Sequence, residues 1–376
     1  MKQRIVSSLF GAIAAVTAAS AVGTPGLASA QTVNIYNWND YIGETTLEDF
    51  KADSGISYNY DIYDNLEILE QKLLVGRSGY DITVPTAEPT MSRLIKAGAL
   101  QKLDKSKIPN LKNLDPALMK QVERSDPGNE YGVIYQWGTI GIGINAEKIK
   151  ALMPDAPLDS FKLIFDPEVA KKLAPCGITI LDSATDTFPT VLHYLGLDPN
   201  SDKAEDLKKA EDTLMKIRPY VKNFVTGQNI NNLAAGDACV ALAYSGDVIQ
   251  AQARAAEANA GVTVDYVVPK EGVQLWFDMM TITKDAPNVD AAHKFIDFIL
   301  KPDTMAGITN YTNYANAVPA SLETVDEAVK SNPSVFPTDE AKQKMFTVSA
   351  VAPAAERLRT RSWTRIMMSR LEPTWL

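Results

Sequence analysis

The chain has 376 residues, a formal net charge of −9 and 45% hydrophobic residues. This acidic balance argues against a nucleic acid or an anionic membrane surface as the partner, and two histidines in the whole chain exclude a histidine-rich metal site. The length suits two domains of ordinary size, each with enough apolar residues for its own core.

The first thirty residues have the pattern of a secretory signal peptide. Lys2 and Arg4 precede an uncharged apolar stretch over residues 5–22, and Ala28 and Ala30 supply small residues at a cleavage point. The alternative is a retained membrane anchor, which the polar residues after the stretch disfavour, and no later segment has about 18 uninterrupted apolar residues. We therefore expect residues 1–30 to be removed and the mature protein to be periplasmic, with a formal charge of −11 (−9 less the two lost positive charges).

The first part of the mature chain alternates between strand and helix patterns. In the second helix, Leu66, Leu69 and Leu73 form one apolar face, and Asn65 can cap its first turn. This β-α-β-α-β order predicts a parallel sheet with helices on its faces. The predicted strands cover residues 32–38, 56–63 and 81–85, and the predicted helices cover residues 44–54 and 65–75.

A second region with the same alternation begins near residue 177. Its longest helix carries an apolar stripe of Leu207, Ala210, Leu214 and Ile217. We expect strands over residues 177–181, 238–244, 262–269 and 275–283, and helices over residues 185–195, 203–217, 247–258, 290–300 and 302–309.

Residues 137–145 and the neighbourhood of Pro269 are the candidate points at which the chain crosses between the two regions. Gly141 and Gly143 form a short G-x-G there, but no third glycine follows at the spacing of a nucleotide-binding loop. A strand that passes close to another backbone is the favoured interpretation.

Cys176 and Cys239 are the two cysteines of the chain. In an exported protein, an even and minimal count favours one disulfide, and two buried free thiols remain the alternative. Such a bridge would close a loop of about 60 residues and stabilise the fold by roughly 4 kcal/mol in the chain-entropy model.

Three short stretches combine an acid with aromatic residues, and two of them directly follow a predicted strand. They are residues 38–41, 244–247 and 276–278. Open α/β sheets bind ligands beyond the carboxyl ends of their strands. A polyamine needs this combination, because carboxylates balance its cationic nitrogens and ring faces contact both its methylenes and its charges. Each stretch alone is weak evidence, since an acid beside a core aromatic is common.

Several motifs along the mature chain resemble one family of proteins. They are IYNWNDY (residues 35–41), LDKSK (103–107), GTIGIGIN (138–145), YLG (194–196), GDACV (236–240), PKEG (269–272), YANA (314–317) and RTRSWT (359–364). With these motifs the chain resembles the putrescine- and spermidine-binding proteins that deliver polyamines to ABC transporters. The resemblance covers essentially the whole mature chain, and it also implies that Cys176 and Cys239 form a disulfide.

The resemblance implies a set of ligand-binding residues. Asp40 would hold one terminal ammonium group, Asp247 would hold the other nitrogens, and Asp278 would complete the acidic set. Around them the implied lining residues are Trp38, Asn39, Tyr41, Thr86, Asp186, Tyr244, Trp276 and Tyr314. Asn39, Tyr244 and Trp276 depart from the residues common in relatives, and the larger indole at Trp276 leads us to expect spermidine slightly before putrescine.

The resemblance also implies the fold and the partners. We expect an α/β protein with the two-lobe, type II periplasmic binding protein fold, in which each lobe is a mainly parallel sheet flanked by helices and the ligand cleft lies between them. Lobe 1 would contain residues 31–137 and about 268–310, and lobe 2 residues 138–267 and about 311–376. The partners would be a polyamine and a membrane ABC permease. We expect a monomer that is not an enzyme and needs no metal or cofactor.

Two alternatives remain open. The protein could bind another small solute, such as an amino acid or an iron complex, although a site for anions would use arginines and helix N-termini in place of three acids. It could also be a secreted hydrolase with a pair of carboxylates of distinct proton affinity. His193 has no accompanying nucleophile motif, so we interpret it as a packing residue.

Overall fold

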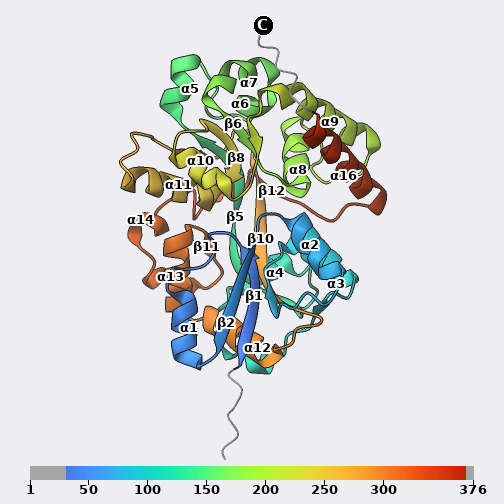
Figure 1. The fold of residues 1–376 in the computed structure, drawn as a ribbon, viewed down its shortest axis with the longest axis vertical. Coiled ribbons are helices and arrows are strands. Elements are labelled where there is room, and N and C mark those ends of the chain that lie inside the picture. Colours follow the sequence, from blue (N-terminus) through green and yellow to red (C-terminus); the bar gives the residue numbers. More distant parts are fainter. Residues whose placement is uncertain (1–30, 370–376) are drawn as a thin grey trace, which may run out of the picture.

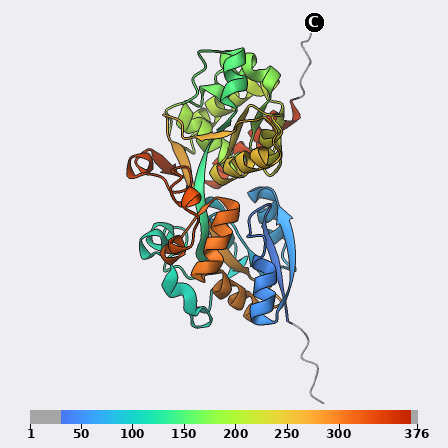
Figure 2. The same ribbon diagram turned by 90° about the vertical axis from the view of Figure 1, so that its left-hand side faces the viewer.

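A computed structural model describes residues 31–369 of the chain. They form two bodies joined by the long strands β5 (Gly132–Ile144) and β10 (Val273–Thr283), and a view turned by 90° shows the same narrow middle (Figures 1 and 2). The predicted signal peptide, residues 1–30, lies outside the described part. Within residues 31–369, no helix has the length and apolar character needed to cross a membrane.

The first lobe is built from the N-terminal part of the chain and two later helices. Its elements are β1 (Thr32–Trp38), α1 (Thr46–Ser54), β2 (Ser57–Tyr63), α2 (Leu66–Leu74), β3 (Ile82–Thr83), α3 (Ser92–Lys96), β4 (Leu100–Gln101), α4 (Pro116–Val122), α12 (Val289–Ile299) and α13 (Pro302–Thr312). The predicted strands and helices of this region are confirmed, with ends that differ by a few residues.

The second lobe follows the end of β5. Its elements are α5 (Ala146–Leu152), α6 (Lys162–Phe165), α7 (Pro167–Leu173), β6 (Ile178–Ile180), α8 (Ala184–Tyr194), α9 (Ala204–Ile217), β7 (Asn223–Phe224), α10 (Gln228–Ala234), β8 (Val240–Tyr244), α11 (Ser245–Glu257) and β9 (Asp265–Val267). The last part of the chain adds β11 (Ala315–Asn316), α14 (Glu327–Lys330), α15 (Asp339–Lys342), β12 (Met345–Thr347) and α16 (Pro353–Met368).

The strands are hydrogen-bonded in the order β2-β1-β3-β10-β5-β8-β6-β7. In the first lobe β1 runs parallel to β2 and β3, and in the second lobe β6 runs parallel to β7 and β8. These pairs confirm the predicted parallel sheets. The connecting strands β5 and β10 run antiparallel to each other and to their outer neighbours, so hydrogen bonding continues from one lobe into the other.

Local sequence explains the helices that flank the site. Leu66, Leu69 and Leu73 of α2 are buried, and the Asn65 side chain accepts a hydrogen bond from the Ile68 backbone N–H, which caps the helix as predicted. The four residues of the stripe predicted for α9 are also buried. Apolar residues three and four apart share one helix face, so their burial fixes the side of each helix that meets the sheet.

The glycines at the crossing permit close contact between strands. A Cβ atom at Gly141 would lie 2.6 Å from the Val267 carbonyl oxygen, closer than real Cβ atoms approach. This strand therefore passes another backbone closely, as expected, and the G-x-G is a packing feature.

The final segment of the chain contacts both lobes. β11 pairs with β5, and the Asp115 backbone N–H donates to the Ala317 carbonyl at 2.7 Å, which attaches residues 315–317 to first-lobe elements. In contrast, α16 packs on α9, with Arg365 hydrogen-bonded to Glu211 at 2.7 Å. The last segment of lobe 2 was predicted to begin at about residue 311. We propose that it begins between α14 and α16 instead.

Cys176 and Cys239 form a disulfide with their Cα atoms 5.5 Å apart. This confirms the predicted bridge and excludes two free thiols. The bond joins the turn before β6 to the residue before β8, so it lies wholly in the second lobe. His193 packs on Phe346 with ring centroids 4.2 Å apart, in agreement with a packing role.

Candidate functional site

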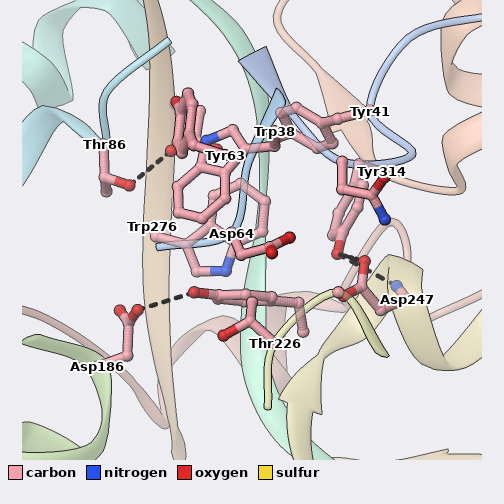
Figure 3. A pocket seen from close by; sticks show the side chains of 14 residues that line it. Trp38, Tyr41, Tyr63, Asp64, Thr86, Asp186, Thr226, Asp247, Trp276 and Tyr314 are labelled. Carbon is pink, nitrogen blue, oxygen red and sulfur yellow. Dashed lines mark hydrogen bonds between the residues drawn. The ribbon is translucent and has the colours of Figure 1, made fainter. Parts of the chain in front are cut away.

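A pocket lies between the two lobes (Figure 3). Residues from both lobes and from the connecting strand β10 line it. The lining residues are Trp38, Asn39, Tyr41, Tyr63, Asp64, Thr86, Asp186, Thr226, Gly227, Tyr244, Asp247, Trp276, Asp278 and Tyr314. Ten of the eleven predicted ligand-binding residues are in this set, although they come from segments far apart in the chain.

Asp278 lies on β10 and is 4% exposed. Its carboxylate accepts a hydrogen bond from the Thr86 hydroxyl at 2.6 Å. Burial raises the pKa of Asp278 to about 7, although the hydrogen bond from Thr86 acts in the opposite direction. The carboxyl group thus keeps its proton far more readily than an exposed aspartate.

Asp247 occupies the first turn of α11. Its carboxylate accepts from the Tyr314 hydroxyl at 2.7 Å, and its own backbone N–H donates to the same hydroxyl oxygen at 3.1 Å. Burial raises the pKa of Asp247 to about 7. The Tyr314 hydrogen bond opposes this shift.

Asp186 belongs to the first turn of α8 and is also 4% exposed. One carboxylate oxygen accepts from the Tyr244 hydroxyl at 2.8 Å, and the other accepts from the Gln274 amide nitrogen at 3.2 Å. Burial raises the pKa of Asp186, and these hydrogen bonds oppose the shift. Ser183 caps the helix by accepting from the Asp186 N–H, which places the carboxyl group at the start of α8.

The carboxylates of Asp186 and Asp278 are buried and that of Asp247 is partly buried, and their hydrogen-bond partners are hydroxyl or amide groups. Among the residues that the structure describes, no Lys, Arg or His lines this cavity. In the same described part, no group of three or more acidic, His or Cys side chains could hold a metal ion. Because buried charges need a compensating charge, the pocket favours a cation that reaches several separate acids.

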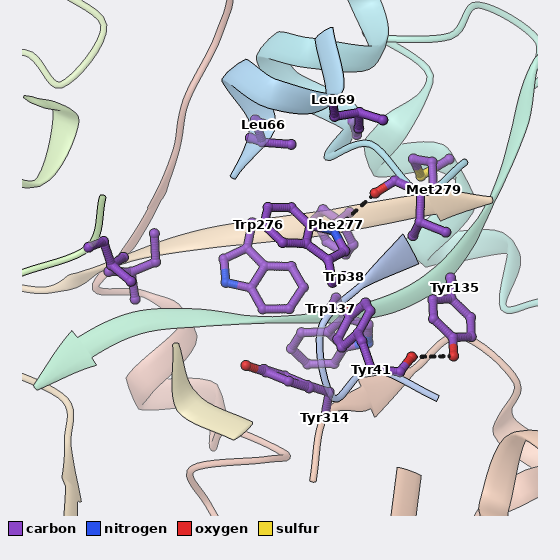
Figure 4. Packing of buried hydrophobic residues seen from close by; sticks show 14 of the residues in the cluster. Trp38, Tyr41, Leu66, Leu69, Tyr135, Trp137, Trp276, Phe277, Met279 and Tyr314 are labelled. Atoms are coloured by element: carbon purple, nitrogen blue, oxygen red, sulfur yellow. Dashed lines mark hydrogen bonds between the residues drawn. The ribbon is translucent and has the colours of Figure 1, made fainter. Parts of the chain in front are cut away.

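Aromatic rings line the pocket beside the acids, and three of them, Trp38, Trp276 and Tyr314, also belong to the hydrophobic cluster drawn in Figure 4. The Trp276 indole lies edge-on to Tyr244 and Tyr314, with centroid distances of 5.8 and 5.2 Å. Trp38 contacts Tyr63 at 4.7 Å and is held by a hydrogen bond from its indole N–H to the Val84 carbonyl at 3.0 Å. Ring faces of this kind attract both alkyl chains and cations.

Gly138 lets Trp276 reach its place in the wall. A Cβ atom at Gly138 would lie 2.8 Å from the indole Cζ2 atom. The cross-strand register pairs these two residues directly, so their side chains share one face of the β5–β10 ribbon. A side chain at Gly138 would displace the indole from the pocket.

Asp40 is the predicted residue that the pocket does not include. It follows β1 with a left-handed backbone (φ 50°), and its carboxylate forms an ion pair with Arg254 at 3.2 Å and accepts from the Asn39 amide at 2.9 Å. In this structure the Asp40 carboxylate faces Arg254, so the direct ammonium contact predicted for Asp40 stays a prediction. Strand alternation ends at Trp38, so sequence position could not show where the next acid points.

Four lining residues were missed in the sequence, namely Tyr63, Asp64, Thr226 and Gly227. Trp38 and Tyr63 are register partners on the parallel strands β1 and β2. The rule that placed Trp38 at a strand end therefore applies equally to Tyr63 and Asp64. Thr226 and Gly227 follow β7, which has only two residues and gave no clear pattern.

Contacts between the lobes hold the pocket in a closed arrangement. The Glu67 carboxylate, from the first lobe, accepts hydrogen bonds from the Thr185 backbone N–H at 3.2 Å and hydroxyl at 3.0 Å, in the second lobe. The ion pair of Asp40 with Arg254 also joins the two lobes. Closure of this kind encloses a ligand between two lobes by a hinge movement.

A model of the family described as bacterial extracellular solute-binding protein matches residues 45–338. The chain belongs to this family. Membership confirms the predicted class of extracytoplasmic solute-binding protein.

Two relatives of this solute-binding protein match along almost their whole length. The putrescine-binding periplasmic protein SpuD of Pseudomonas aeruginosa (strain UCBPP-PA14) is 47% identical over 355 residues, which cover 94% of this chain and 96% of SpuD. The putrescine-binding periplasmic protein PotF of Escherichia coli (strain K12) is 44% identical over 360 residues, which cover 95% and 97%.

A solved structure has the same fold. The putative spermidine/putrescine ABC transporter protein from Listeria monocytogenes is 31% identical and superimposes with a TM-score of 0.80, covering 90% of this chain and all of that one. This agreement confirms the predicted type II periplasmic binding protein fold.

Proposed function

We propose that this protein binds a polyamine, putrescine or spermidine, between its lobes and delivers it to an ABC permease from the periplasm. One observation carries the proposal: Asp186, Asp247 and Asp278 converge on one aromatic-walled pocket that, within residues 31–369, has no cationic side chain in its lining. A linear polycation supplies the missing positive charges at several points and alkyl segments for the rings between them.

The relatives support the same ligand class. SpuD and PotF, at 47% and 44% identity, are both named for putrescine. These names support a diamine ahead of the spermidine preference that the bulk of Trp276 led us to expect. The chain would act as a monomer, with the closed form of its lobes as the surface that the permease recognises.

The hydrolase alternative has less support in the pocket. A pair of catalytic carboxylates needs environments that drive the two proton affinities apart, so that one acts as acid and the other as base. Here burial raises the pKa of both Asp247 and Asp278 to about 7. Burial thus shifts both acids in the same direction, which suits charge balance better than proton transfer.

Calorimetric titration of the mature protein tests the proposal. We expect putrescine, cadaverine, agmatine or spermidine to bind with one site per chain, and no chemical change in the ligand recovered afterwards. Glutamate and succinate, which are anionic, serve as controls and should give no heat of binding. Absence of saturable binding to all four amines, or turnover of any of them, would overturn the proposal.

A further inference from the structure

Gln274 occupies the cleft face of β10, although it does not line the pocket. Side chains two apart on a strand point to the same side, so Gln274 shares its face with Trp276 and Asp278. The register irregularity of β10 comes only after Asp278, and the alternation therefore holds across all three positions. Gln274 is 1% exposed and lies beside the Asp186 end of the pocket.

The hydrogen bonds of Gln274 are incomplete. Its amide nitrogen donates to Asp186 at 3.2 Å, whereas its amide oxygen is buried and has no hydrogen-bond partner within residues 31–369. An ionised carboxylate only accepts, so the nitrogen must face Asp186 and the oxygen must be the unpaired atom. A buried acceptor without a donor costs about 1–3 kcal/mol, which a ligand donor can recover.

An ammonium group fits this arrangement. It carries three N–H donors and no acceptor. The Asp186 carboxylate and the free Gln274 oxygen are neighbouring acceptors, and the Tyr244 hydroxyl already uses its proton on Asp186. Figure 3 shows Asp186 and Asp247 on opposite sides of the pocket, so a nitrogen at Asp186 would be a different one from that at Asp247.

We propose that Gln274 orients Asp186 and accepts a hydrogen bond from the ligand nitrogen at this end of the pocket. This inference rests on the proposed function and adds a recognition residue that sequence resemblance did not include. It makes the Asp186 end selective for a nitrogen with at least two N–H donors, one for the carboxylate and one for the amide oxygen. A trimethylated nitrogen, which has none, is rejected there.

Gln136 provides a matched control. It lies on the neighbouring strand β5, is fully buried, and also has an unpaired amide oxygen, but its nitrogen donates to the Thr312 hydroxyl at 2.6 Å in place of a pocket carboxylate. If the loss of a buried amide merely disturbed the fold, Gln136→Leu and Gln274→Leu would have similar effects on binding.

The test is calorimetry with putrescine on the full mature protein. We expect Gln274→Leu to weaken binding by at least about tenfold, which corresponds to one or two lost hydrogen bonds to charged groups. Gln136→Leu should stay within about twofold of the unsubstituted protein, because the Gln136 amide hydrogen-bonds to Thr312 and not to the pocket acids, although Gln136 is the cross-strand partner of Asp278. If Gln274→Leu does not fold, Gln274→Met, which keeps the length of the side chain, is measured in its place.

A double-mutant cycle separates positioning from general damage. In an Asp186→Asn background, Gln274→Leu should cost less than about threefold, because residues that act on one ligand atom are not additive. If the protein binds putrescine and Gln274→Leu binds it equally well, or if the two losses are fully additive, this inference is wrong while the proposed function stands. If the unsubstituted protein binds no amine, the proposed function itself fails.

Discussion

Aspartates in the interior of the pocket and the aspartate at its rim have different partners. In the interior, the carboxylates of Asp247 and Asp278 accept hydrogen bonds only from hydroxyl groups, and no basic side chain of the described part of the chain lines the pocket. At the rim, Asp40 is already paired with Arg254, and both side chains are about one-third exposed. Among residues 31–369, Asp40 thus has a direct ion-pair partner, whereas Asp247 and Asp278 have none, although Arg254 also lowers the pKa of Asp247.

This difference identifies the acids on which a cationic ligand depends. An unbalanced carboxylate in a buried site responds by holding its proton, as the raised pKa values of Asp247 and Asp278 indicate. A bound ammonium group reverses that response by stabilising the ionised form. The rim acid gains little from a second cation, because Arg254 and solvent already stabilise its charge.

The largest effect that this comparison predicts is at the interior acids. Asp278→Asn keeps the shape of the side chain and removes its charge, and we expect putrescine affinity to fall by at least about tenfold, with a similar loss for Asp247→Asn, since a broken buried charge pair costs several kcal/mol. Asp64→Asn is the control, because Asp64 lines the same pocket but is exposed. Calorimetry that gives equal losses at Asp64 and Asp278 would contradict the role assigned to burial.

The second predicted effect is a dependence of putrescine affinity on pH. Without ligand, Asp247 and Asp278 have pKa values of about 7, so at pH 6 both carry protons that a cation must displace. We expect affinity to fall below pH 7 by about tenfold per pH unit for each proton released, since one pKa unit corresponds to 1.36 kcal/mol. Titration at pH 6.5 in two buffers of different ionisation enthalpy should reveal proton release, and identical heats in both would contradict it.

The raised pKa values of Asp247 and Asp278 also predict how pH affects the stability of the ligand-free protein. Their folded-state pKa is raised from 3.8 to about 7, so between these values the folded protein binds more protons than the unfolded chain. The stabilisation is therefore complete below pH 3.8 and lost as pH rises through 7. Thermal unfolding should show this contribution as a lower melting temperature at pH 8 than at pH 6, which Asp247→Asn together with Asp278→Asn should largely remove.

Much of this architecture was accessible from the sequence, for identifiable reasons. Helix α9 follows its apolar stripe, and Trp38 and Tyr244 lie where strands end, because periodic burial and strand direction are local properties. The family resemblance then added Thr86 and Tyr314, which no local pattern indicates. Together these signals found most of the lining.

The features that the sequence did not predict depend on tertiary contacts. The direction of Asp40 is decided by a left-handed turn and by Arg254 on the opposite lobe, and neither is visible in local spacing. The attachment of residues 315–317 to the first lobe depends on pairing with β5 across almost 180 residues of chain. Gln274 was passed over because a buried glutamine in a strand has no signature until its partners are known.

The smallest predicted effect is at the rim of the pocket. It decides whether Asp40 pairs with Arg254 or contacts the ligand directly. The Asp40–Arg254 pair joins the lobes at a partly exposed site, where such pairs contribute about 0–1 kcal/mol. Arg254→Gln and Asp40→Asn should therefore each change putrescine binding by less than about fivefold, and the change should shrink as added salt screens these charges. If Asp40→Asn instead costs as much as Asp278→Asn while Arg254→Gln costs little, Asp40 contacts the ligand directly, and the division between interior and rim is wrong.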